Sequence, residues 1–483
     1  MKTKTIFKNQ SQKLQAAFMK AQNPEKVLFV PIDFAKQTHY AFFCDGYGQY
    51  LRKPFTVRND REGVGYLIES IEKTRKSKGI QSRDQVIIAG EDSASYTQNF
   101  MLRLADHGYI TMQVNAHEVH RQAESIDSST DKTSLQAIAK TLLNRNAREF
   151  ATPDDYKQLR EFTRQRRRFV HQTTRVKNRI HTHADRLFPG FLSSESMINA
   201  FSAASIELMR GSFSAVIFSK KPLTQLQRRL ERLGVKNAAQ IALALKEQAR
   251  RSIPAQAEVA TTSYQLLQSE LDLYLALERN TTLMDREIAR QLARTPAAFL
   301  TSIRGLGITL IAAIIAEIGD LSSAPRTDSI NAYAGIIPKV KQTGGPESEA
   351  HVRGKRQRFN RILKDYLLQA GNHLYLHGPE DLMNDARCRK AANKAVETAM
   401  ARRLLRIARS LVKNHCIYLP AHLCNDTDQT GVRQRAQYIV NTWPAMLLKW
   451  KRLGLAQEAF APDMPLGMWR VNAQEIYEIE LPL

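Results

Sequence analysis

The stretch Val27–Phe34, with the sequence VLFVPIDF, is a short apolar run of strand-forming residues that contains an acid, Asp33, near its end. Two more strands are predicted directly after it, at Thr38–Cys44 and Gln49–Val57, because the turn residues Asp45–Gly48 (DGYG) separate two further runs of this kind. Three successive strands joined by tight turns predict an antiparallel meander.

The next segment alternates helices and strands. The pattern predicts a helix, a buried strand, a second helix and a second strand at Asp60–Lys78, Gln85–Glu91, Ser95–His107 and Tyr109–Asn115. Strand–helix–strand order implies parallel pairing through right-handed crossovers. A meander followed by such units is the order of an RNase H-like (resolvase-like) fold. We therefore expect an α/β domain of this class at residues 26–150, after a basic N-terminal extension at residues 1–25.

The rest of the chain is predicted to be mainly helical. Residues 151–295 form a helical linker, in which a bundle or a coiled-coil seam is indicated by apolar residues at helical spacing, namely Leu266, Leu273, Leu277 and Met284. Thr295–Pro296 opens a second, mainly α domain at residues 296–375. A helical extension follows at residues 376–483.

Two glycines stand directly before the most apolar helix of the second domain. Gly305 and Gly307 precede the run Ile308–Ile318, a pattern typical of a helix-hairpin-helix element. Glycines let the backbone approach a phosphate, and the amides at a helix N-terminus favour the anion. An ordinary packing corner between helices is the alternative.

The chain is strongly basic. It has 71 Lys and Arg against 47 Asp and Glu, a net charge of +24, so it should be drawn to a polyanion. Charge alone does not choose among DNA, RNA and a membrane surface. Ten of the basic residues lie between Lys157 and Arg186, where there are only two acids. We expect phosphate contacts from this helix, at Arg164, Arg166, Arg167, Arg168, Arg175, Lys177 and Arg179, with a solvated helix face as the alternative.

Other classes of protein fit the sequence poorly. Four scattered cysteines make no disulfide framework, and the spacing around Cys416 and Cys424 fits no strong zinc pattern. The N-terminal residues lack the apolar core of a signal peptide, and no apolar run is long enough to span a membrane. We expect a cytoplasmic, nucleoid-associated protein without a membrane partner.

Three acids are candidates for catalysis. Asp33 and Glu91 end two strands that lie side by side in an RNase H-like sheet, and Asp131 opens a predicted helix from which a carboxylate can reach the same edge. Clustered carboxylates repel one another unless a cation lies between them, and hard oxygen ligands suit Mg²⁺ or Mn²⁺. Two such ions can stabilise the attacking and leaving oxygens of a phosphodiester displacement. Acids at strand ends can equally be ordinary turn residues.

A second candidate is the hydroxyl of Thr343, in the Gly-rich turn Gln342–Gly345 (QTGG). Basic residues surround this turn in the sequence, namely Lys339, Lys341, Arg353, Lys355, Arg356 and Arg358. A hydroxyl there could attack a phosphodiester, while the cations offset the charge that develops on the phosphate oxygens. A solvent-exposed loop with a turn threonine is the alternative.

These segments together resemble a known family. The motifs are PIDFAK (31–36), GEDSASY (90–96), VN (114–115), TDKTSLQA (130–137), IRGLGI (303–308), AEIGD (316–320), AYAG (332–335), PKVKQTGG (338–345) and NRIL (360–363). In order and spacing they are similar to the DEDD transposases of insertion sequences mobilised by a structured bridge RNA. That family also contains the Piv-type DNA invertases.

The resemblance implies a recombinase with four metal-binding acids in the RNase H-like domain and a serine nucleophile in the second domain. Asp33, Glu91 and Asp131 match the first three acids. The family also implies Mg²⁺, donor and target DNA chosen by pairing with a noncoding guide RNA, and a homo-oligomer, either a dimer or a tetramer.

Two positions depart from the family pattern. Ser134 stands where the fourth acid belongs, which should weaken metal affinity, and Thr343 stands where the serine belongs. Asp127 and Ser348 are weaker replacement candidates. Three functions therefore stay open: a transposase that uses Thr343, a resolvase-like nuclease that uses water, and a degenerate relative that binds nucleic acid without cutting it.

Overall fold

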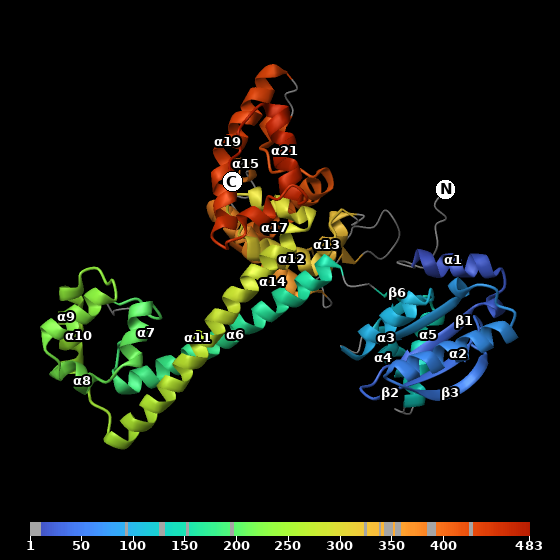
Figure 1. The fold of residues 1–483 in the computed structure, drawn as a ribbon, viewed down its shortest axis with the longest axis horizontal. Helices are drawn as coiled ribbons and strands as arrows, with labels where there is room; N and C mark the ends of the chain where they lie inside the picture. The colour runs from blue at the N-terminus through green and yellow to red at the C-terminus, as the bar shows by residue number, and fades with distance from the viewer. Residues whose placement is uncertain are drawn as a thin grey trace. The chain divides into compact units, whose positions relative to one another are not determined.

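The computed structural model describes residues 11–91, 95–124, 131–150, 154–193, 198–322, 326–337, 340–341, 351–352, 359–383, 393–424 and 428–483. The chain divides into two compact units, Met1–Thr152 and Pro153–Leu483. In Figure 1 the first unit is coloured blue to cyan and the second runs from cyan-green to red.

The first unit contains a six-stranded mixed sheet with the order β3-β2-β1-β4-β5-β6. Its strands are β1 (Leu28–Asp33), β2 (Thr38–Cys44), β3 (Tyr50–Arg58), β4 (Val86–Glu91), β5 (Ile110–Val114) and β6 (Ala147–Glu149). The first three form the antiparallel meander, β4 and β5 run parallel to β1, and β6 returns antiparallel at the edge. The predicted mixed α/β sheet is confirmed, and its strand order is consistent with an RNase H-like domain.

Helices cover both faces of this sheet. On one face, α2 (Arg61–Ser77) and α3 (Ser95–Asp106) pack on the even-numbered residues of β1. On the other, α1 (Gln12–Ala21), α4 (Ala116–Ala123) and α5 (Asp131–Leu143) share a core with Phe29 of β1. The predicted N-terminal extension thus contains a helix, α1, whose Leu14 is fully buried.

The second unit is built on two long helices that lie side by side, α6 (Asp155–Leu187) and α11 (Ala257–Ala293) (Figure 1). The predicted seam on α11 is wrong in part. Leu266 and Leu273 are 44% and 45% exposed, whereas Leu267 and Leu271 are buried. The helix carries two apolar stripes one residue apart, and the structure buries the second one.

Two apolar cores lie along this helix pair. Near the end of α6 and the start of α11, a helical lobe (residues 198–251) encloses a group of phenylalanines. It consists of α7 (Ala203–Arg210), α8 (Ala215–Lys220), α9 (Leu223–Arg232) and α10 (Ala238–Arg251). Near the other end lies the C-terminal core.

The C-terminal core combines the predicted second domain with the extension that follows it. Its helices are the 3-10 helix η3 (Pro296–Ser302), α12 (Ile308–Ile318), α13 (Thr327–Tyr333), α14 (Arg361–His377), α15 (Glu380–Met383), α17 (Asn393–Asn414), α18 (Ala421–Cys424), α19 (Gln429–Lys451), α20 (Ala456–Ala459) and α21 (Pro465–Tyr477). Trp443 and Trp450 of α19 are buried in the same core as Ile311 of α12. None of the described helices is long and apolar enough to cross a membrane.

The glycine turn before α12 is a packed corner. Gly305 has a φ of +86°, and a side chain there would meet the His373 carbonyl oxygen at 3.1 Å, at the end of α14. The element before the turn is the 3-10 helix η3, where a helix-hairpin-helix has an α-helix. A phosphate contact at Gly307 stays a prediction.

Candidate active site

Asp33 and Glu91 end two adjacent parallel strands at the same level. Ile32 of β1 is paired with Gly90 of β4, so the two acids are the next residues along each strand. Neighbouring strands lie about 4.8 Å apart, and residues at matching positions project from the same face. Gly90 is required here because any side chain would collide with the Phe34 ring and the Ile32 carbonyl.

The two acids interact electrostatically. Burial and the negative charge of Asp33 raise the pKa of Glu91, and His120 on α4 offsets part of this rise. A raised pKa means that the charged form of Glu91 is disfavoured in its surroundings. The chemistry of the pair, two hard oxygen donors whose charges repel, therefore fits a divalent cation.

Helix α5 approaches this site from the face to which odd-numbered β1 residues point. Its residues Leu135, Ile138 and Leu142 are buried in the same core as Phe29. Residue 131 begins this helix, one turn before Leu135. Ser134 follows in the first turn and is half-buried.

The side chain of Asp131, like Asp127 as a whole, lies outside the described residues. Among the side chains that are described, no group of three or more His, Cys, Asp or Glu is arranged to hold a metal. The structure thus brings together two of the three predicted acids and places the helix start that carries the third.

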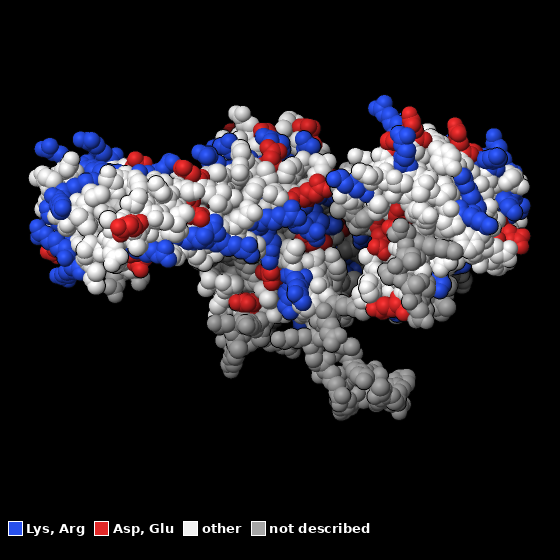
Figure 2. All heavy atoms as spheres, turned by 90° about the horizontal axis from the view of Figure 1, so that it is seen from below, with Lys and Arg blue, Asp and Glu red and all other residues white. Residues whose placement is uncertain are grey.

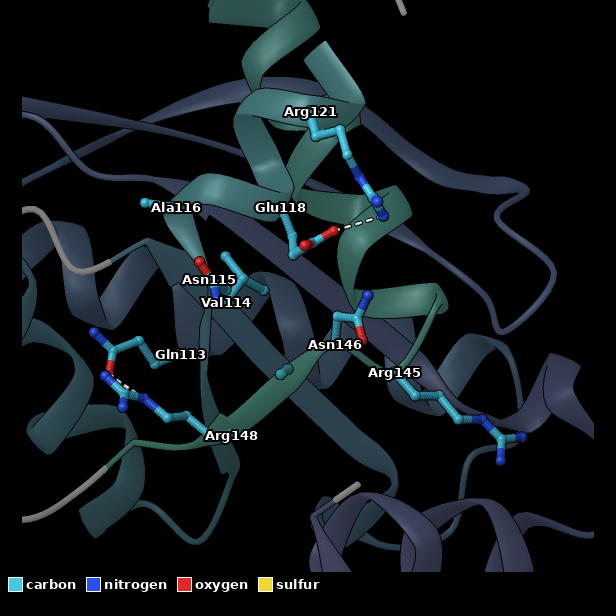
Figure 3. A pocket seen from close by; sticks show the side chains of 10 residues that line it. Gln113, Val114, Asn115, Ala116, Glu118, Arg121, Arg145, Asn146 and Arg148 are labelled. Carbon is cyan, nitrogen blue, oxygen red and sulfur yellow. Dashed lines mark hydrogen bonds and ion pairs between the residues drawn. The ribbon is translucent and has the colours of Figure 1, made fainter. Parts of the chain in front are cut away.

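A polar pocket of about 660 Å³ opens beside these strands (Figure 3). Val114, which is paired with Glu91, is one of its lining residues. Glu118 forms an ion pair with Arg121 at 2.6 Å. Arg148 Nε donates a hydrogen bond to Gln113 Oε1 at 3.1 Å. Asp33, Glu91 and Ser134, the predicted catalytic residues whose side chains are described, do not line this pocket.

Thr343, the predicted nucleophile, belongs to a segment of which the structure describes only two short strands. The short strands β7 (Val340–Lys341) and β8 (His351–Val352) pair antiparallel, and residues 342–350 connect them. Outside the described residues lie Thr343, Ser348 and most of the predicted cations, namely Lys339, Arg353, Lys355, Arg356 and Arg358, together with the side chain of Lys341.

The residues that flank segment 334–359, which carries Thr343, are held together beside a buried carboxylate. Asn360, at the start of α14, donates its backbone N–H to the Tyr333 carbonyl at 2.8 Å and its side-chain N–H to Glu317 Oε2 at 2.8 Å. Arg164 of α6 donates twice to the same carboxylate, at 2.7 and 2.9 Å. We call Arg164, Glu317, Tyr333 and Asn360 the Glu317 clamp.

The hydrogen-bond donors of the clamp keep the buried Glu317 carboxylate in its charged form. The Glu317 side chain is only 1% exposed, and burial alone would raise its pKa. The hydrogen bonds from Arg164 and Asn360, together with the positive charges of Arg164 and Arg160, outweigh burial, so the pKa of Glu317 lies below its usual value. Glu317 is therefore ionised and holds α6, α12 and α14 at one point.

Several arginines predicted to contact phosphate form ion pairs within the protein. Besides Arg164, these are Arg166 with Asp285, Arg167 with Asp365 at 2.8 Å, and Arg179 with Glu270 at 2.6 Å. Lys177 lies over the Tyr274 ring at 5.3 Å. Arg168 bonds only to Gln165 on its own helix among the contacts described. These ion pairs connect α6 to α11 and α14. Phosphate contact by the same arginines stays a prediction.

Sequence reasoning missed the clamp, although a signal was present. Glu317 is the single charged residue in the apolar run Ile308–Ile318, and a buried acid in such a run requires a cationic partner. Arg164 is 153 residues away in the chain, so local spacing could not identify it.

Comparison with known proteins places these features in a family. Residues 30–189 match a model of DEDD transposases of the IS110 type, described as "Transposase", and residues 297–382 match the model described as "Transposase IS116/IS110/IS902 family". The chain is also similar to a protein of Streptomyces clavuligerus, "Insertion element IS116 uncharacterized 44.8 kDa protein". The two are 24% identical over 410 residues, which cover 82% of this chain and 96% of that protein.

The two family models cover both groups of residues described above. The first covers nearly all of the sheet, with Asp33 and Glu91, and continues through the whole of α6. The second covers α12, α13 and α14, with three of the four clamp residues, Glu317, Tyr333 and Asn360. The DEDD type of the first model also implies a requirement for a divalent metal. The chain belongs to the IS116/IS110/IS902 family of transposases and is therefore a DNA recombinase.

Proposed function

We propose that this transposase uses two sets of residues, an acidic cluster in the first unit and a hydroxyl in the second. Asp33, Glu91 and Asp131, with Ser134 at the fourth position, would hold Mg²⁺ or Mn²⁺. Such an ion supplies positive charge to the oxygens of a phosphodiester under attack. The observation that carries this proposal is the pairing of β1 with β4, which sets Asp33 beside Glu91.

Thr343 is the proposed nucleophile. Its oxygen would attack the phosphorus, displace a deoxyribose oxygen and leave the protein covalently joined to DNA. Threonine keeps the hydroxyl of the family's serine, but its β-methyl group restricts χ1. The Glu317 clamp supports this role because it fixes both ends of the segment that carries Thr343.

A suicide DNA substrate tests the proposal on a denaturing gel. Wild-type protein with Mg²⁺ should form a covalent adduct, Thr343→Ser should form it at least as well, and Thr343→Ala should form none. Cleavage by Thr343→Ala without an adduct would support the nuclease that uses water. Ser134, which adds no charge at the fourth acid position, favours a second candidate, a nucleic-acid-binding relative that shows no cleavage at any Mg²⁺ or Mn²⁺ concentration.

The proposed partners are donor and target DNA, a structured noncoding guide RNA and further copies of this chain. An exposed stripe on α11 supports a homo-oligomer. Val259, Leu266 and Leu273 are 44–45% exposed and stand seven residues apart, the spacing of one side of a coiled coil. For the guide RNA, the test is the DNA that flanks the gene, where a structured noncoding segment should match both element ends and an insertion site.

A further inference from the structure

The helical lobe between the two family models is strongly basic. Residues 198–251 contain ten Lys and Arg and three Glu, a net charge of +7 out of the +24 of the whole chain. The first family model ends at residue 189 and the second begins at residue 297, so neither covers the lobe. Figure 2 shows Lys and Arg side chains spread over this lobe, at the left of the view, with few acids between them.

Part of this charge has a structural role. Arg210 forms an ion pair with Asp272 of α11, Arg229 donates to the Glu207 carbonyl at 2.9 Å, and Lys246 donates to the Lys221 carbonyl at 2.5 Å. Six other basic residues are exposed and form no ion pair with any described residue, namely Lys220, Arg228, Arg232, Lys236, Arg250 and Arg251.

The arrangement of these six residues has an energetic cost. Arg228 and Arg232 stand one turn apart on the same face of α9, and like charges at this spacing destabilise a helix by about 0.2–0.5 kcal/mol. Arg250 and Arg251 are adjacent at the end of α10. Arg232, Arg250 and Arg251 lie in the last turns of these helices, where the helix dipole favours cations, but the dipole does not remove the repulsion between neighbouring cations. A polyanion that binds this surface would remove the repulsion.

The lobe is also packed against the end of α6 by aromatic rings. Phe188 and Phe191 at the end of α6 pack against Phe213 and Phe218 of the lobe, with ring centroids 4.8–6.3 Å apart. A preformed surface loses little entropy when it binds. Lys221 is less suited to binding, since its amino group lies over the Phe218 ring.

The lobe lies at a distance along α6 that suits duplex DNA. Leu159 of α6 belongs to the C-terminal core and Ile180 of α6 belongs to the lobe core. At 1.5 Å per residue these positions are about 30 Å apart, close to one turn of B-DNA at roughly 34–36 Å. A duplex held at the C-terminal core would therefore reach the lobe about one turn further on.

We propose that the lobe binds the phosphate backbone of duplex DNA about one helical turn from the C-terminal core, through Arg228, Arg232 and Lys236 together with the basic residues at the ends of α8 and α10. This goes beyond the proposed function and requires only that the chain binds DNA. It does not depend on Thr343 or on a metal.

The test compares two triple variants of the full chain. The lobe variant is Arg228→Glu, Arg232→Glu and Lys236→Glu. The control is Lys73→Glu, Lys76→Glu and Lys78→Glu, which changes three exposed residues of α2 and its end, in the first unit, and gives the same change in net charge. Binding to a 40-base-pair DNA duplex and to an RNA hairpin of equal length is measured in EDTA between 50 and 300 mM salt. Thermal melting verifies that each variant is folded.

Each lost phosphate contact should reduce the magnitude of the slope of log K against log salt by about 0.9. Because the lobe variant loses three contacts, its slope on DNA should be smaller by about three. Its Kd for the duplex should rise at least tenfold relative to the control at about 0.15 M salt. If the lobe variant fails to fold, the three glutamine substitutions replace it, with the same expected direction.

Equal losses in the lobe and control variants would overturn the proposal, because only long-range charge would then matter. A loss confined to the RNA hairpin would overturn it as well. Because binding is measured without metal, failure of wild-type protein to form a covalent adduct would defeat the proposed function and leave this result unaffected.

Discussion

Asp33 and Glu91 lie at matching positions of two hydrogen-bonded parallel strands, and the charge of Asp33 contributes to the raised pKa of Glu91. Two acids that served only as turn residues would gain nothing from this arrangement. Instead, the sheet holds two like charges together in a partly buried site, at a cost that a divalent cation would offset.

The raised pKa of Glu91 has a consequence for stability without metal. A carboxylate whose folded pKa is above its unfolded value destabilises the ionised protein above the folded pKa, and the cost disappears as pH falls to the unfolded value near 4.3. In EDTA at pH 8, Glu91→Gln should therefore raise the Tm. The increase should shrink as the pH is lowered from 8 toward the unfolded value in a calorimetric series. Glu69→Gln, an exposed control on α2, should leave the Tm unchanged. A lower Tm for Glu91→Gln at pH 8 would count against the repulsion.

Ser134 offers a gain-of-function variant. Position 134 lies in the first turn of α5, three residues after Asp131. Ser134→Asp would add a carboxylate at the position predicted for the fourth acid, so the Kd for Mn²⁺ should fall by about tenfold, a gain near 1.4 kcal/mol. Ser134→Ala is the matched control and should change the Kd little. Isothermal titration calorimetry with Mn²⁺ measures both, and an unchanged Kd for Ser134→Asp would place residue 134 away from the ion.

The Glu317 clamp predicts a stability defect. Arg164→Ala leaves the buried Glu317 carboxylate without its main partner, and breaking a buried pair in this way typically costs about 3–5 kcal/mol. Since the Arg164 side chain is 46% exposed, solvent screens part of that interaction, and we expect about 2 kcal/mol in denaturant unfolding. Arg168→Ala removes an exposed arginine of the same helix and should stay within about 0.5 kcal/mol of wild type. Equal effects of the two variants would show that the clamp adds no stability.

Much of the first unit followed from local pattern. The strands at Val27–Phe34 and Gln85–Glu91 were predictable because apolar runs bounded by turn residues are short-range signals. Strand β6 was missed because its three residues, Ala147–Glu149, carry no alternation. Helix α1 was missed because its few buried residues lie among lysines, and its packing on the sheet is a tertiary effect.

The second unit shows where a single sequence is ambiguous. Helix α11 has Leu at both 266 and 267, so two stripes could have faced α6, and only packing decides between them. Likewise, Arg164 and Arg168 look alike in the sequence, but only Arg164 has a buried partner, on α12. A pair of residues this far apart in the chain cannot be identified from the local sequence pattern around either one.

The stripe left exposed on α11 predicts self-association. Leu266→Glu with Leu273→Glu should abolish oligomers in sedimentation velocity, because two charges would enter an apolar contact between copies. Leu243→Glu, on the exposed side of α10, is the control and should leave the distribution unchanged. Oligomers that persist in the double variant would show that the exposed stripe on α11 does not form the contact between copies.

The acidic cluster is tested most directly by anomalous diffraction from crystals soaked in Mn²⁺. We predict a Mn²⁺ peak within about 2.5 Å of carboxylate oxygens from Asp33, Glu91 and Asp131 together. A Mn²⁺ peak bound elsewhere, or one that Asp131 cannot reach while Asp33 and Glu91 do, would contradict the three-acid site.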